Sequence, residues 1–145
     1  MQLKYNVLIV DDVVENIQIA MNILREENYN LTFALSGEEA LKLIEDNHFD
    51  LILLDIMMPN MDGYELLQEL KSDPELENIP VLIFSALKTP KSEQKVYELG
   101  ADGFIVKPID PKRMIEQIGK VLDRKKMGTS NLFTESQSDS ELKLA

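Results

Sequence analysis

The chain has 145 residues, of which 44% are hydrophobic, and this is enough for one well-buried core but too little for two. Its 15 lysines and arginines stand against 26 aspartates and glutamates, and the net charge of −11 argues against direct binding to nucleic acid or to an anionic membrane. The sequence has no cysteine, which excludes disulfides and thiolate metal sites in this chain. It also shows no signal-peptide pattern and no apolar run of the ~20 residues that span a bilayer. We therefore expect a soluble cytoplasmic protein.

Five short apolar runs predict β-strands. The run Leu31–Ala34 is mixed in character, and we expect it at the edge of a sheet. The other four are nearly continuous, which is typical of inner strands in a parallel sheet that helices cover on both faces. These four runs are Val7–Val10, Leu51–Leu54, Val81–Phe84 and Phe104–Val106.

Helical patterns separate these strands. Apolar side chains recur every three or four residues from Ile17 to Leu24 and from Met114 to Leu122, so each helix has one stripe that faces the sheet. Strands alternating with helices predict an α/β domain with a doubly wound, five-stranded parallel sheet, because five units are too few for an eight-stranded barrel. Further helix starts are indicated by the capping patterns at Ser36–Glu39, Asp62–Glu65, Thr89-Pro90 and Asp110-Pro111.

The composition changes near the C-terminus. From Gly128 onward, serine, threonine and acidic residues alternate with only a few apolar ones, and such a composition is typical of a flexible segment. We therefore predict a domain over residues 1–126 and a flexible tail or linker over residues 127–145.

Chemically active side chains follow the inner strands. Asp11 and Asp12 follow the run that ends at Val10, and Asp55 follows the run that ends at Leu54. Ser85 and Lys107 follow the last two runs. In a parallel sheet these strand ends meet at one edge. Three crowded carboxylates repel one another and favour a shared cation, and an all-oxygen set of this kind suits Mg2+. A lysine and a hydroxyl beside such an ion would stabilise a phosphoryl group during its transfer.

This arrangement resembles the receiver domain of two-component response regulators, including the chemotaxis regulators. The resemblance extends over residues 5–125 and rests on the acidic pair, Leu-Leu-Asp-Ile-Met-Met-Pro at 53–59, Phe-Ser-Ala at 84–86 and Phe-Ile-Val-Lys-Pro at 104–108. It implies a flavodoxin-like (βα)5 fold with strand order 2-1-3-4-5. It also implies that Asp55 accepts a phosphoryl group from the phosphohistidine of a sensor histidine kinase or a phosphotransfer protein.

The same resemblance assigns roles to the neighbouring residues. Asp12 and Asp55 would bind Mg2+ directly, together with the backbone carbonyl of Met57, while Asp11 would act through a water molecule. Mn2+ would be able to replace Mg2+. Lys107 would pair with one phosphoryl oxygen, and the hydroxyl of Ser85 would bond another.

The resemblance further implies a switch and an output surface. Phe104 matches the family's switch aromatic, although it lacks the hydroxyl with which a tyrosine would anchor an outward position. The output surface would comprise the helix after Pro90, the strand 104–106 and the helix after Pro111, including Tyr97, Phe104 and Ile109. An output domain, a protein partner or a second copy in a phosphorylation-dependent dimer would bind there. A cis peptide bond before Pro108 is also implied.

Position 57 separates this interpretation from another functional class. A haloacid-dehalogenase-like, Mg2+-dependent phosphatase also forms an aspartyl phosphate, but it needs a second aspartate two residues after the nucleophile, where this chain has Met57. A flavin-binding module would need a hydroxyl- and glycine-rich loop after a strand, which this sequence lacks. We therefore expect a signalling phosphoacceptor and not an enzyme, either acting alone or as the receiver segment of a larger hybrid kinase or multidomain regulator.

Two apolar residues beside the expected site bear on how long a phosphoryl group persists. Met57 and Leu87 each lie two residues beyond a site residue, at positions where a polar side chain could hold an attacking water. We therefore hypothesise that self-dephosphorylation is slow.

Overall fold

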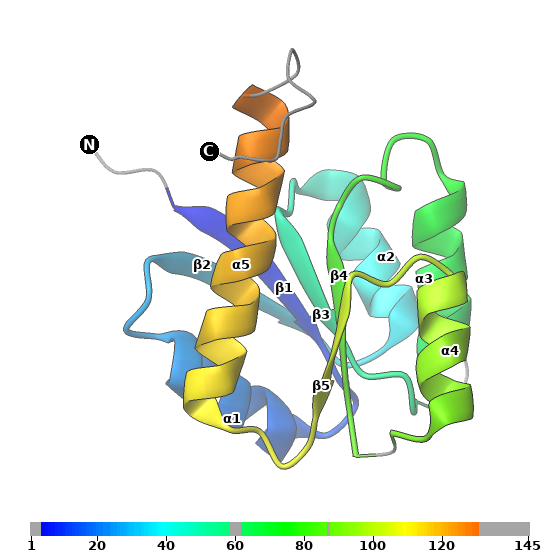
Figure 1. Ribbon diagram of the computed structural model, residues 1–145, viewed down its shortest axis with the longest axis horizontal. Helices are drawn as coiled ribbons and strands as arrows, with labels where there is room; N and C mark the ends of the chain where they lie inside the picture. Colours follow the sequence, from blue (N-terminus) through cyan, green and yellow to red (C-terminus); the bar gives the residue numbers. More distant parts are fainter. Residues whose placement is uncertain (1–3, 59–61, 87, 131–145) are drawn as a thin grey trace.

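The computed structural model describes residues 4–58, 62–86 and 88–130, with the backbone alone for residues 124–130. Five β-strands and five α-helices alternate along this part of the chain (Figure 1). The strands are β1 (Tyr5–Val10), β2 (Tyr29–Ala34), β3 (Leu51–Leu54), β4 (Val81–Ser85) and β5 (Gly103–Val106). The helices are α1 (Val14–Leu24), α2 (Gly37–Asp46), α3 (Gly63–Ser72), α4 (Pro90–Glu98) and α5 (Pro111–Ser130).

The strands form one parallel sheet in the order β2-β1-β3-β4-β5. This order confirms the doubly wound, flavodoxin-like fold expected from the sequence. β2 lies at the edge, as its mixed composition predicts, and the side chain of Phe33 on it is 47% exposed. β1 and β3 lie at the centre and are covered on both faces, which explains why their sequences are apolar without alternation.

Two hydrophobic cores lie on opposite faces of the sheet, beneath the helices that cover each face in Figure 1. Successive residues of a strand point to opposite faces, so Leu8 and Val10 enter one core while Val7 and Ile9 enter the other. α2, α3 and α4 cover the first core, and α1 and α5 cover the second. The predicted apolar stripes of α1 and α5 face the sheet, since the buried residues of both helices belong to the second core.

The helix starts follow the predicted capping patterns, with one difference. Thr89 and Asp62 each form a complete capping box, with Ser92 and Glu65 respectively. At α2, the hydroxyl of Ser36 accepts a hydrogen bond from the Glu39 amide at 3.1 Å, as expected. The Glu39 carboxylate, however, accepts from the amide of Leu35 at 2.6 Å and not from that of Ser36, so the reciprocal half of this box is displaced by one residue.

The last helix, α5, extends to Ser130. The division into a domain over residues 1–126 and a tail or linker over residues 127–145 stays a prediction. Residues 131–145 lie outside the described part of the chain, so the flexible tail stays a prediction there. Among the residues that the structure describes, no helix combines the length and apolarity needed to cross a membrane.

Candidate functional site

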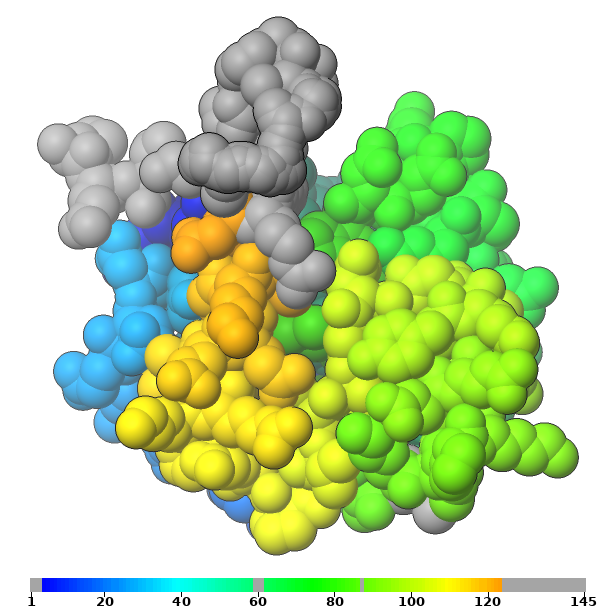
Figure 2. Space-filling model, viewed as in Figure 1, coloured from blue at the N-terminus to red at the C-terminus, as the bar shows by residue number. Residues whose placement is uncertain are grey.

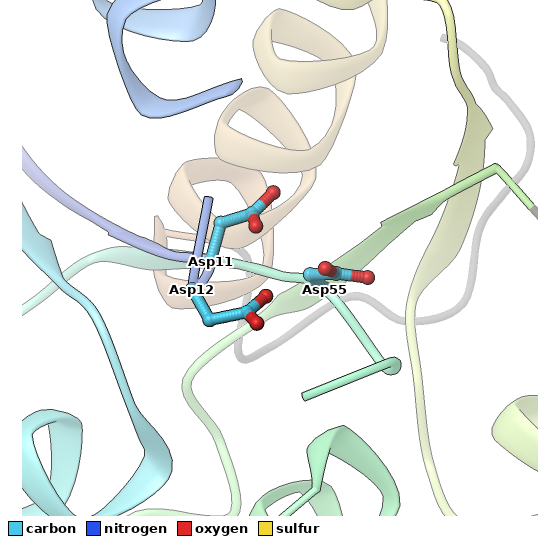
Figure 3. A group of neighbouring side chains, drawn as sticks. All are labelled: Asp11, Asp12 and Asp55. Atoms are coloured by element: carbon cyan, nitrogen blue, oxygen red, sulfur yellow. The ribbon is translucent and has the colours of Figure 1, made fainter. Parts of the chain in front are cut away.

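Backbone hydrogen bonds between neighbouring strand ends build the acidic site. The amide of Asp11 donates to the carbonyl of Ala34 at the end of β2, and the amide of Asp55 donates to the carbonyl of Val10 at the end of β1. These bonds extend the sheet pairing by one residue, and they carry the side chains of Asp11, Asp12 and Asp55 to the same edge (Figure 3). One carboxylate oxygen from each of the three lies within 4.8 Å of the others.

The three carboxylates differ in their environment. Asp11 is fully buried, and its Oδ1 accepts a hydrogen bond from the amide of Val13 at 2.9 Å. Asp55 is 5% exposed, and its Oδ1 accepts from the amide of Met57 at 3.1 Å. Asp12 is the most accessible of the three. The edge of the sheet therefore holds two buried acids behind one that solvent can reach.

Lys107 supplies the positive charge at this site. Its Nζ lies 2.8 Å from Oδ2 of Asp11 and 3.6 Å from Oδ2 of Asp55, and the side chain is only 14% exposed. Its amide donates to the carbonyl of Ser85, which holds the end of β5 against the end of β4. The ammonium group of Lys107 is therefore within hydrogen-bonding distance of Asp11 but lies farther from Asp55.

The pKa of Asp55 reflects both its burial and the charged and polar groups beside it. Burial raises the pKa of the Asp55 carboxyl to about 6. The Met57 amide and the Lys107 ammonium group lower this pKa, whereas the neighbouring Asp11 raises it further. Ionisation of Asp55 is therefore costly in this site and would be eased by a bound cation.

The donor set suits a magnesium ion. Three carboxylates lie together, and the ammonium group of Lys107 is closest to Asp11. The positive charge of Lys107 does not balance the three carboxylates, so these four groups carry a net negative charge when ionised. All the donors are oxygens, and fewer than six come from side chains, which matches the preference of Mg2+ for a few carboxylates plus water. The residues present therefore fit such an ion.

The remaining predicted site residues surround this group at different depths. Ser85 ends β4 and is fully buried, whereas the side chain of Met57 is 56% exposed. Phe104 is 4% exposed and lies in the core beneath α2, α3 and α4, so in this structure it does not form part of the surface. Val106 is the exposed apolar residue of β5, at 42%. The peptide bond between Lys107 and Pro108 is cis, as expected. Leu87 lies outside the described residues.

Two supporting residues were not predicted from the sequence. The ring of Phe84 lies 4.7 Å from Nζ of Lys107 and packs against its charged end, whereas the sequence showed Phe84 only as a core residue of a strand. Gly63 is the first residue of α3, and a Cβ atom there would lie 2.2 Å from Cα of Ile56 and 2.4 Å from the carbonyl oxygen of Asp55. A glycine at the first position of a helix was the signal for this close approach.

Comparison with known proteins agrees with this geometry. Residues 7–119 match the family described as the response regulator receiver domain. A probable transcriptional regulator, ycf29 of Porphyra purpurea, is 33% identical over 137 residues, which cover 94% of this chain and 66% of that protein. A probable cyclic di-GMP phosphodiesterase of Vibrio cholerae is 40% identical over 103 residues, which cover 71% of this chain and 23% of that protein.

A solved structure shows the same fold. The chemotaxis protein CheY4 of Vibrio cholerae superimposes with a TM-score of 0.78 and 28% sequence identity, over 82% of this chain and 99% of that one. The chain thus covers nearly all of a receiver domain but only part of the longer relatives. The sequence match, the fold and the acidic site together show that this chain belongs to the family of response regulator receiver domains.

Proposed function

We propose that this chain accepts a phosphoryl group on Asp55 from the phosphohistidine of a sensor histidine kinase or a phosphotransfer protein. One observation carries the proposal: the buried carboxylate of Asp55 lies 3.6 Å from Nζ of Lys107 and within 4.8 Å of the carboxylates of Asp11 and Asp12. A nucleophile beside both a cation site and a fixed ammonium group is the arrangement that phosphoryl transfer requires.

The residues of the site divide the chemistry among them. An oxygen of Asp55 attacks phosphorus, and the bond from phosphorus to the histidine nitrogen breaks. Asp12, Asp55 and the backbone carbonyl of Met57 would hold Mg2+, with Asp11 acting through a water molecule. Mg2+, or Mn2+ in its place, would neutralise charge on the phosphoryl oxygens.

Two further groups would stabilise the product. Lys107 lies between Asp11 and Asp55, so a small movement of its flexible side chain would bring the ammonium group to a phosphoryl oxygen. The hydroxyl of Ser85, at the neighbouring strand end, would bond a second oxygen. Both groups would bind the phosphorylated aspartate more strongly than the free carboxylate, because the phosphorylated side chain carries more negative charge.

The signal would leave through α4, β5 and α5. Phe104 is buried behind α4 in this structure, and Nζ of Lys88 lies 5.7 Å from its ring. Tyr97 is 45% exposed on α4, a helix whose buried residues are only Ser92 and Val96. α4 and α5 both contribute to the face seen in Figure 2. We propose that phosphorylation changes the position of α4 relative to β5 and so alters this surface.

The whole protein's output is a separate proposal. The relatives named above are longer than this chain and are described as a transcriptional regulator and a cyclic di-GMP phosphodiesterase. We propose that the surface of α4, β5 and α5 controls an output domain, a protein partner or a phosphorylation-dependent dimer. The domain itself would act as a signalling phosphoacceptor, with self-phosphorylation and slow autodephosphorylation as its own reactions.

The test is chemical phosphorylation of the purified chain. Incubation with acetyl phosphate and Mg2+ should add one phosphoryl group, detected by intact mass, and the adduct should be absent from Asp55→Asn. Asp46→Asn is the matched control, because Asp46 is an exposed aspartate at the end of α2, on a different part of the chain. An adduct that persists in Asp55→Asn, or no adduct on the wild-type chain, would refute the proposal.

The side chain at position 57 is expected to control the lifetime of the adduct. Met57 is exposed beside Asp55 and is apolar, so it offers no hydrogen bond to an attacking water. We expect Met57→Asn to lose its phosphoryl group at least several-fold faster than the wild type, because an amide can position that water. The measurement is the decay of the adduct after acetyl phosphate has been removed. Equal decay rates for the two proteins would contradict this expectation.

A further inference from the structure

Met57 is an exposed thioether at the edge of the phosphoacceptor site. Its side chain is 56% exposed, whereas that of the next residue, Met58, is 7% exposed and belongs to the core. The backbone amide of Met57 donates to Oδ1 of Asp55 at 3.1 Å, so the exposed side chain begins directly beside the proposed phosphoacceptor. Methionine is usually a buried, gap-filling residue, whereas this thioether is open to solvent and to dissolved oxidants.

The composition of the chain directs oxidation toward methionine. The sequence has no cysteine, so no thiol of this protein competes with methionine for an oxidant. Among the methionines whose side chains the structure describes, Met114 is fully buried, Met58 is 7% exposed and Met21 is partly buried. Met57 is therefore the accessible member of this group, and it is also the one at the site.

Oxidation would reverse the property of Met57 that protects the phosphoryl group. A thioether sulfur is only a weak hydrogen-bond acceptor, whereas a sulfoxide oxygen is a strong acceptor that can hold an attacking water. The added oxygen would give position 57 the polar group that the Met57→Asn variant supplies with an amide. Because the modification is reversible by methionine sulfoxide reductases, it could act as a switch and not only as damage.

We propose that Met57 is a redox modification site, at which oxidation by hydrogen peroxide shortens the lifetime of the phosphoryl group on Asp55. The sulfur lone pair attacks one peroxide oxygen, the S–O bond forms as the O–O bond breaks, and one water molecule leaves. The sulfur is oxidised by two electrons and the peroxide is reduced by two. This inference rests on the proposed phosphoacceptor function of Asp55.

The first measurement locates the modification without using phosphorylation. The wild-type chain is titrated with hydrogen peroxide, and the rate of oxidation of each methionine is followed by peptide mapping. Met57 should be oxidised well before Met58 and Met114, because these two are buried. Oxidation of Met57 at the same rate as Met58 would overturn the proposal.

The second measurement follows the phosphoryl group. Wild type, Met57→Leu and Met58→Leu are phosphorylated with acetyl phosphate and Mg2+, desalted, and divided into untreated and peroxide-treated halves. The ratio of treated to untreated decay rates is determined within each protein, so each variant serves as its own reference. The ratio should be at least about threefold for the wild type and Met58→Leu, because both keep the oxidisable side chain, and close to one for Met57→Leu. Methionine sulfoxide reductase should restore the slow decay of the treated wild type.

The outcomes separate the inference from the function on which it rests. Complete oxidation of Met57 without faster decay, or equal acceleration in Met57→Leu, would overturn the inference while leaving the phosphoacceptor function intact. If no adduct forms even before peroxide is added, the proposed function itself fails, and the inference fails with it.

Discussion

At the scale of single residues, we expect the buried carboxyl group of Asp55 to lower the stability of the fold that holds it. Its carboxyl is buried beside Asp11, and the ammonium group of Lys107 lies closer to Asp11 than to Asp55. An ionised carboxylate is poorly solvated in such a place. The same feature makes the site receptive to a cation and to a phosphoryl group held by that cation.

Because the ionised carboxylate of Asp55 is poorly solvated, the stability of the folded chain should depend on pH. The pKa of Asp55 is raised to about 6 in the folded chain, compared with about 3.9 for an exposed aspartate. Between these values the folded state binds more protons than the unfolded state, so the free energy of unfolding falls as the pH rises. We expect the neutral variant Asp55→Asn to raise the free energy of unfolding by about 1–2 kcal/mol at pH 8 and to have little effect near pH 4.

Urea denaturation in EDTA at pH 4, 6 and 8 would measure this effect. Asp46→Asn, which removes an exposed carboxylate, is the control for the loss of one negative charge. A gain for Asp55→Asn that is the same at pH 4 and pH 8 would show that burial does not raise the pKa of Asp55.

At the scale of elements, the connection from β3 to α3 keeps Asp55 in place. The amide of Gly63, the first residue of α3, donates to the carbonyl of Ile56 at 3.2 Å, and its Cα lies against the backbone of the residues that follow β3. The complete capping box of Asp62 and Glu65 holds the start of the same helix. The start of α3 thus supports the backbone of Asp55, the proposed phosphoacceptor.

Gly63→Ala should therefore disturb both stability and the site. A Cβ atom 2.2 Å from Cα of Ile56 has no space, and the backbone of Asp55 and Ile56 would have to shift. We expect the free energy of unfolding to fall by about 2–4 kcal/mol and phosphorylation by acetyl phosphate to slow. Chemical denaturation and the intact-mass assay measure the two effects.

α5 offers a matched glycine for comparison. At Gly119 a Cβ atom would meet nothing within 4 Å, so Gly119→Ala should raise the free energy of unfolding by about 0.5–1 kcal/mol through helix propensity alone. Equal effects of the two substitutions would mean that crowding at Gly63 is not what requires a glycine there.

At the scale of the whole molecule, a cation bound at this site would couple its binding to folding. The three carboxylates come from the ends of β1 and β3, which are brought together only by the folded sheet. A cation that binds the folded chain alone raises the free energy of unfolding in proportion to the logarithm of its concentration. Mg2+ should also reduce the repulsion among the three carboxylates.

We expect millimolar Mg2+ to raise the free energy of unfolding by about 1–3 kcal/mol relative to EDTA. Asp12→Asn should lose most of this gain, because it removes the most accessible carboxylate of the cluster. Glu15→Gln, at an exposed acid in the first turn of α1, should keep it. Stabilisation that is equal in Asp12→Asn and Glu15→Gln would point to nonspecific screening and not to a bound ion.

Much of this architecture was predictable from local patterns. The periodicity of apolar residues depends on neighbours close in the chain, so the strands, the helices and the edge position of β2 could be predicted without tertiary information. The same holds for the gathering of Asp11, Asp55 and Lys107, because strand ends of a parallel sheet must share one edge. The resemblance to receiver domains supplied the strand order.

The contacts among these residues could not be predicted from local patterns. The tertiary structure placed Lys107 closer to Asp11 than to Asp55, the ring of Phe84 against that lysine, Phe104 within the core and Gly63 against the backbone of Ile56. None of these contacts follows from periodicity, because each joins atoms whose separation is set by the packing of both cores against the sheet. Local sequence patterns were thus enough to identify the groups at this edge of the sheet, whereas the packing of the helices on the sheet sets which of these groups come into contact.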